Sequence, residues 1–296
     1  MGTRARLKAL GSGADVLCVS VVTTPTSQLS TRIAPPDLGL GGSADLAYQP
    51  AVDLATGRLL GFEALLRWNS PAGVTPPGTF IPWAEANGHM GRLNAWILAE
   101  ACAQAARWPA AIQVSVNCSL PQLRRGEVSV ATAHALESSG LNPERLTVEV
   151  TEAAVIDPEA GTDLRAIAAL GAQLAVDDIG SDWSVLDRLR ELAVHTMKID
   201  GANTAGVAAA DGLRRTIVET IVNLSHSLGI CTVAEAVETL EQVEVLRELG
   251  ADVAQGYFFS APLVSGHALA LAAMDPIPCL DLTRSVAERT KLDEPA

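Results

Sequence analysis

Short apolar segments alternate with helix-length segments along most of the chain, and this alternation constrains the fold more than any other feature. Its periodicity predicts strands at 46–54, 60–68, 111–116, 146–150, 172–176, 194–199, 230–234 and 252–256. It predicts helices at 80–108, with a break near residue 88, and at 121–139, 158–170, 182–190, 211–228 and 240–249. Strands that are linked through helices pair in parallel. About 220 residues of this pattern favour a TIM-type (β/α)8 barrel over an open sheet.

The two ends of the chain differ in composition from this central part. Residues 1–43 contain one short apolar run and are otherwise rich in Thr, Ser, Pro and Gly, so we expect a flexible leader there. The barrel domain is expected at 44–270 and a C-terminal tail at 271–296. No apolar run reaches about 18 residues, so the sequence predicts no membrane span.

Charge and cysteine usage narrow the class of protein. The formal net charge is -13, which argues against a general surface for duplex nucleic acid or acidic membranes. The five cysteines are scattered and include no CxxC pair, so neither a zinc site nor a disulfide framework is indicated. This pattern favours a cytoplasmic location.

Polar side chains stand at or near the ends of six predicted strands. They are Glu63, Asn117, Glu149, Asp177 with Asp178, Lys198 with Asp200, and Glu235. An isolated pair of aspartates is usually a solvated turn. The carboxyl ends of barrel strands, however, converge at one rim, where active sites lie. Independent turns would not place such groups at nearly every successive strand, so the pattern favours one shared site.

Oxygen ligands without histidine or cysteine favour a hard cation such as Mg²⁺ or Mn²⁺. Two ions about 3.5–4 Å apart would use this many carboxylates and would clamp a phosphodiester. Either Asp177 or Asp178 could then bridge the two ions. Glu63 and Arg67 share a strand face, where they could pair with each other or hold a cation beside an anion.

Nine short motifs, in order, resemble the EAL domain, a bacterial phosphodiesterase family that linearises cyclic di-GMP to pGpG. These motifs are Tyr48-Gln49-Pro50, Glu63-Ala64-Leu65-Leu66-Arg67-Trp68, Phe80-Ile81-Pro82, Ser115-Val116-Asn117, Val148-Glu149-Val150-Thr151-Glu152, Asp177-Asp178, Lys198-Ile199-Asp200, Ala234-Glu235 and Gln255-Gly256-Tyr257. The resemblance covers 46–265. It implies a barrel with one antiparallel strand, two Mg²⁺ or Mn²⁺ ions and cyclic di-GMP as the substrate.

The resemblance also implies roles for individual residues. The implied metal ligands are Glu63, Asn117, Glu149, Asp177 and Asp178, with Asp177 shared between the ions. The implied catalytic group consists of Lys198, which holds the attacking water, Glu235, a candidate base, and Glu152, which braces the loop after Asp178. The implied substrate-binding residues are Arg67 at a phosphate, with Gln49, Asp200 and Gln255 positioning the dinucleotide. A homodimer is left open.

Two departures from the family pattern keep a second function open. Asp182 replaces a glycine in the loop 179–185, adding a side chain and a charge at a position where a glycine could adopt a positive φ. Ala236 replaces the glycine that usually follows the glutamate at position 235, which is a mild change. The alternatives to hydrolysis of cyclic di-GMP are an EAL-like receptor or interaction module without turnover, and hydrolysis of another phosphodiester on the same barrel.

Overall fold

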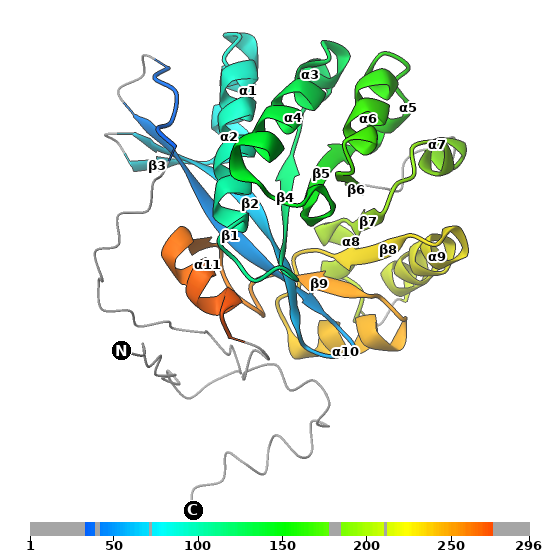
Figure 1. Ribbon diagram of the computed structural model, residues 1–296. Helices are drawn as coiled ribbons and strands as arrows, with labels where there is room; N and C mark the ends of the chain where they lie inside the picture. The colour runs from blue at the N-terminus through cyan, green and yellow to red at the C-terminus, as the bar shows by residue number, and fades with distance from the viewer. Residues whose placement is uncertain (1–32, 39–41, 71–72, 178–184, 210–211, 275–296) are drawn as a thin grey trace, which may run out of the picture.

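The computed structural model describes residues 33–38, 42–70, 73–177, 185–209 and 212–274, and these form a closed barrel surrounded by helices (Figure 1). The barrel strands are β1 (Ser43–Asp53), β2 (Leu59–Ser70), β4 (Gln113–Asn117), β5 (Leu146–Thr151), β6 (Gln173–Asp177), β7 (Thr196–Ile199), β8 (Cys231–Ala234) and β9 (Val253–Gln255). Two short strands, β3 (Gly73–Thr75) and β10 (Leu263–Val264), pair at the margins of β2 and β1.

The order of pairing closes the barrel. Strands β2 and β4 to β9 run parallel to their neighbours, whereas β1 lies antiparallel between β2 and β9. The predicted TIM-type barrel with one antiparallel strand is therefore confirmed. Both β1 and β2 continue past the barrel as a long hairpin (Figure 1).

Helices pack on the outside of the strands. They are α1 (Pro77–Ala86), α2 (Met90–Ala105), α3 (Leu120–Arg124), α4 (Glu127–Ser139), α5 (Glu152–Ile156), α6 (Ala160–Ala169), α7 (Val185–Glu191), α8 (Gly201–Ala205), α9 (Leu213–Leu228), α10 (Leu240–Glu248) and α11 (Ser265–Ala272), with a 3-10 turn at Pro143–Arg145. The predicted helical region 80–108 divides into α1 and α2 at the predicted break. The sequence did not indicate the short helices α5 and α8, because one or two turns carry too little periodicity.

Alternation along the strands separates the core from the site. On β5, Val148 and Val150 are buried among the surrounding apolar residues, whereas Thr147 and Glu149 line the space inside the barrel. The outward residues thus make the hydrophobic core with the helices. The inward residues are free to be polar, which is where the predicted site residues lie.

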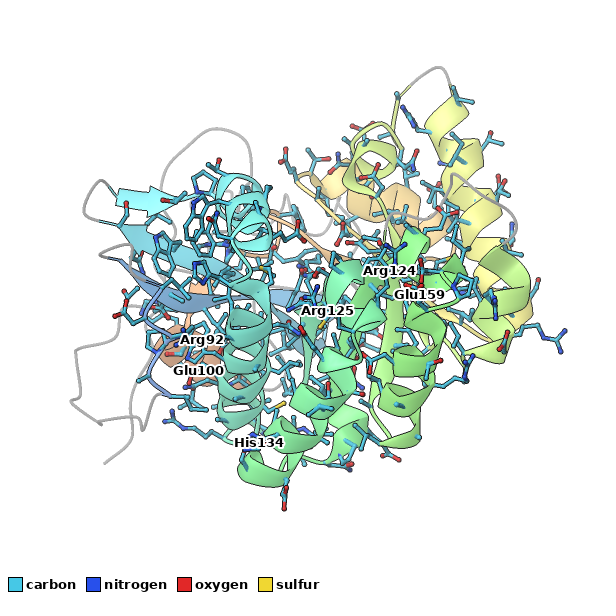
Figure 2. The ribbon with its side chains drawn as sticks, turned by 90° about the horizontal axis from the view of Figure 1, so that it is seen from above. Arg92, Glu100, Arg124, Arg125, His134 and Glu159 are labelled. Carbon is cyan, nitrogen blue, oxygen red and sulfur yellow. The ribbon has the colours of Figure 1, made fainter. Side chains whose placement is uncertain are left out.

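Part of the predicted leader contacts the barrel domain. The Ile33 N–H donates to Oε2 of Glu100 at 2.9 Å, and the Trp96 indole donates to the Ile33 carbonyl at 2.9 Å. Glu100 lies on the side of α2 that meets this segment (Figure 2). Residues 1–32 and 39–41 of the leader and residues 275–296 of the tail lie outside the described residues, so both assignments stay predictions. No helix in the described ranges is long and apolar enough to cross a bilayer.

Candidate active site

The predicted site residues gather inside the barrel because their strands are adjacent. Register places Gln49 of β1 opposite Glu63 of β2, and Asn117 of β4 beside Glu149 of β5. Thr151 of β5 lies beside Asp177 at the end of β6, so side chains of five neighbouring strands face one space. This convergence is what the sequence predicted from the strand ends.

A buried lysine lies at the centre of this space. The Nζ atom of Lys198 lies 2.6 Å from Oε2 of Glu149, 2.5 Å from Oε1 of Glu235 and 3.5 Å from Oε2 of Glu63. Only 2% of Lys198 is exposed. Burial alone would lower the pKa of Lys198, but the charges of Glu149, Glu63 and Glu235 outweigh it and raise that pKa well above its usual value. Lys198 is therefore a cation whose ammonium contacts carboxylates on β2, on β5 and just after β8.

Both carboxylate oxygens of Glu63 are held by amides. Nδ2 of Asn117 donates to Oε1 at 2.6 Å, and Nε2 of Gln255 donates to Oε2 at 2.6 Å. Gln255 also donates to Oε1 of Gln49 at 3.2 Å, and Gln49 donates to the Ser260 carbonyl at 3.4 Å. These bonds hold Glu63 from both sides of the β1–β2 pair, since Asn117 lies on β4 and Gln255 lies on β9.

The carboxylates outnumber the ammonium, and their pKa values reflect this. Burial and the charge of Glu63 raise the pKa of Glu149 to about 7, although Lys198 and a hydrogen bond from Ser115 oppose the shift. Burial raises the pKa of Glu235 to about 7, with Lys198 opposing and Asp177 adding to the shift. A site with excess negative charge and raised carboxyl pKa values favours the binding of a cation.

The donor chemistry fits a hard divalent cation. Oxygen-bearing side chains converge from four neighbouring strands, namely Glu63, Asn117, Glu149 and Asp177. Across the described residues, no three His, Cys, Asp or Glu side chains already form a metal-binding group. Glu149 and Glu235 both contact the ammonium of Lys198. Asp178, the predicted ligand of the second ion, lies outside the described residues.

The remaining predicted residues lie around this cluster. The guanidinium of Arg67 donates to the Leu66 carbonyl at 2.9 Å, and among the described residues no hydrogen bond joins it to Glu63. Pairing of Arg67 with Glu63, left open by the sequence, is therefore not observed. Asp200 begins α8 beyond the end of β7. Glu152 is buried as the first residue of α5, and the loop that it was predicted to brace lies outside the described residues.

Sequence reasoning missed Ser115, whose hydrogen bond lowers the pKa of Glu149. Alternation could have identified it, because Ser115 shares a strand face with Asn117. Below the cluster the barrel holds a cavity of about 380 Å³, and small side chains such as Ala51, Thr147 and Ala175 line it. Larger side chains, among them Gln113, Gln173 and His195, also line this cavity.

Comparison with known proteins matches this geometry to one family. The model of the EAL domain family matches residues 39–262. Two relatives from Pseudomonas aeruginosa are the cyclic di-GMP phosphodiesterase NbdA, 37% identical over 227 residues, and the bifunctional diguanylate cyclase/cyclic di-GMP phosphodiesterase MucR, 36% identical over 235 residues. These matches cover 74% and 77% of this chain but only 29% and 34% of the relatives.

Solved structures agree with the sequence matches. The MucR phosphodiesterase in complex with cyclic di-GMP is 34% identical, with a TM-score of 0.72 over 76% of this chain and 94% of that one. This chain thus spans about a third of the full length of the curated relatives and nearly the whole of the solved MucR domain.

Proposed function

This chain belongs to the EAL domain family, and from that premise we propose that it hydrolyses cyclic di-GMP to linear pGpG with two Mg²⁺ or Mn²⁺ ions. The observation that carries the proposal is the buried Lys198, bonded to Glu149 and Glu235 at a rim where carboxylates are in excess. A structural ion pair would need one carboxylate for one ammonium. The additional carboxylates are explained if cations bind there.

The residues fit the ions by the chemistry of their oxygen atoms. Glu63, Asn117, Glu149 and Asp177 would hold the first ion, and Asp177 with Asp178 the second. When bound, the two ions supply positive charge that neutralises the phosphodiester and promotes ionisation of the attacking water.

The protein groups then orient the reactants. Lys198, a cation fixed by its carboxylate partners, donates a hydrogen bond to the attacking water. Glu235 has a pKa of about 7, which suits a group that accepts the proton of that water near neutral pH. The water oxygen bonds to phosphorus, the bond from phosphorus to O3′ breaks, and the departing O3′ takes up a proton to give pGpG.

Substrate contacts surround this centre. Arg67 offers a planar fork suited to a phosphate. Gln49 and Gln255 are already hydrogen-bonded to each other beside Glu63, so they would position the dinucleotide relative to the ions. Asp200 would contact the dinucleotide from the start of α8, and Glu152 would brace the loop that follows Asp178.

One feature favours the second function, an EAL-like receptor without turnover. Asp182 stands where the family usually has a glycine, in the loop that follows the predicted ligands of the second ion. A receptor would bind cyclic di-GMP with the first ion in place and would not hydrolyse it. Homodimer formation and a cytoplasmic location stay predictions.

A hydrolysis assay separates these functions. The purified full chain is incubated with cyclic di-GMP and either Mg²⁺ or Mn²⁺, and pGpG is separated chromatographically, with cyclic di-AMP and pGpG tested as alternative substrates. We expect pGpG from the wild type and formation of pGpG slowed by about 100-fold or more in Glu63→Gln. Calorimetric binding of cyclic di-GMP without any pGpG would establish the receptor instead, and Asp182→Gly would then be expected to restore turnover.

A further inference from the structure

The turn after β8 holds a residue in an unusual backbone conformation. Ala236 has a φ of 52°, in the left-handed region that favours glycine over any residue with a Cβ. Residues 235–237, which we name the 235–237 turn, connect β8 to the capped start of α10. The preceding residue of this turn is Glu235, whose carboxylate contacts Lys198. Such strain persists only where the surroundings hold the backbone in place.

One side of the turn is held by the end of β9. The Val237 N–H donates to the Gln255 carbonyl at 3.0 Å, and the Val237 carbonyl accepts from Phe258 N–H at 2.9 Å. A Cβ at Gly256 would overlap the backbone N and O atoms of Val237. The turn therefore lies directly against the backbone at Gly256.

The other side of the turn meets the start of α8. A Cβ built at Gly201 would lie 2.8 Å from the Cβ of Ala236, a separation at which one of the two must move. Pairing of the strands explains the approach, because Ile199 lies beside Ala234 and its carbonyl accepts from Glu235 N–H at 3.2 Å. The methyl of Ala236 thus occupies the space that a side chain at residue 201 would need.

The start of α8 is held by its own hydrogen bonds. The N–H groups of Asn203 and Thr204 donate to the Asp200 carbonyl at 3.0 and 3.1 Å, and Thr204 is fully buried. Ala236, in contrast, is exposed and already has a disfavoured φ. Crowding between the two positions would therefore displace the 235–237 turn and with it Glu235.

We propose that Gly201 is a positioning residue for Glu235, because its missing side chain lets Ala236 seat the turn with the Glu235 carboxylate against Lys198. This inference rests on the proposed phosphodiesterase activity only in its kinetic test, which measures hydrolysis. Residues 201 and 236 are thus complementary, because one of them can carry a Cβ methyl but both cannot.

A double-mutant cycle tests this pairing. Steady-state hydrolysis and thermal unfolding are measured for the wild type, Gly201→Ala, Ala236→Gly and the double variant. We expect Gly201→Ala to lower kcat at least tenfold with KM within twofold, and the double variant to recover to within threefold of the wild type. Gly266→Ala is the matched control, because a Cβ at this helical glycine meets no atom within 4 Å; its kcat and KM should not change.

Several outcomes would overturn the inference. These are a wild-type kcat for Gly201→Ala, losses that add in the double variant, or a rise in KM without a fall in kcat, which would indicate that Asp200 moves instead. If Gly201→Ala does not fold, the double variant must fold. If the wild type does not hydrolyse cyclic di-GMP, a crystal structure of Gly201→Ala decides, and Glu235 still bonded to Lys198 would refute the positioning role independently of the proposed function.

Discussion

Replacing Lys198 by methionine keeps most of the side-chain volume and removes the ammonium that holds Glu149 and Glu235. Breaking a buried ion pair by removing one partner costs about 3–5 kcal/mol. The free energy of unfolding of a whole domain is about 5–15 kcal/mol. We therefore expect Lys198→Met to lose about 3–5 kcal/mol of unfolding free energy at pH 8 when metal is absent.

The loss should depend on pH with a definite sign. Glu149 and Glu235 have a pKa of about 7, above the ordinary 4.5 of an unfolded glutamate. A carboxyl with a raised pKa stabilises the folded state at low pH, and this stabilisation is lost as the pH rises through the folded value. Without Lys198 both values rise further. The variant should therefore come close to the wild type at pH 6, where both carboxyls are protonated, and differ most at pH 8.

Urea unfolding of the full chain in EDTA, at pH 6 and at pH 8, measures both quantities. Arg124→Met is the matched control, since Arg124 on α3 also lies 2.6 Å from a carboxylate, that of Asp157, but is exposed (Figure 2). It should change stability little at either pH. A loss for Lys198→Met below about 1 kcal/mol at pH 8, against the about 3–5 expected for a buried pair, would refute the reasoning, and so would equal losses at both pH values.

Three further predictions follow from the same geometry. Metal affinity should rise between pH 6 and pH 8, because a cation must displace the proton from its ligand Glu149, whose pKa is about 7. Calorimetry in buffers of different ionisation enthalpy should detect the released proton, and pH-independent binding would contradict this. Glu63→Gln should lower kcat by about 100-fold or more, on the scale of a lost catalytic electrostatic contact. Its circular dichroism spectrum should stay native, because a glutamine fills the same space between Asn117 and Gln255. Retention of half the activity would exclude Glu63 as a metal ligand. Ala236→Gly should raise the free energy of unfolding by up to about 1 kcal/mol, because removing a Cβ from the left-handed backbone region gains more than the added entropy of the unfolded chain costs. A clear fall in the urea midpoint would show that the backbone at this residue is not strained.

The sequence predicted the barrel because apolar periodicity and short links leave few other arrangements for so many strands and helices. It also predicted that Glu63, Glu149 and Lys198 meet, because strand ends converge in any such barrel. It could not predict which atoms bond, since the contact of Gln255 with Glu63 depends on the register at which β1 closes the barrel. The backbone at Ala236 could not be predicted either. The substitution was expected to be mild, but only the backbone geometry shows that it falls at a positive φ against Gly201.

The antiparallel strand β1 has a consequence for how the chain acquires its site during synthesis. Ala51 of β1 pairs with Gln255 of β9, so β1 waits for a partner strand that is made about 200 residues later. Ribosomes add about 5–20 residues per second, so this interval lasts from roughly ten seconds to under a minute. Until then the edge of β1 that β9 will cover is unpaired, and Glu63 lacks its bond from Gln255. Nascent chains should therefore expose an open sheet edge to chaperones, and competence to bind the ions should arise only after β9 has been made.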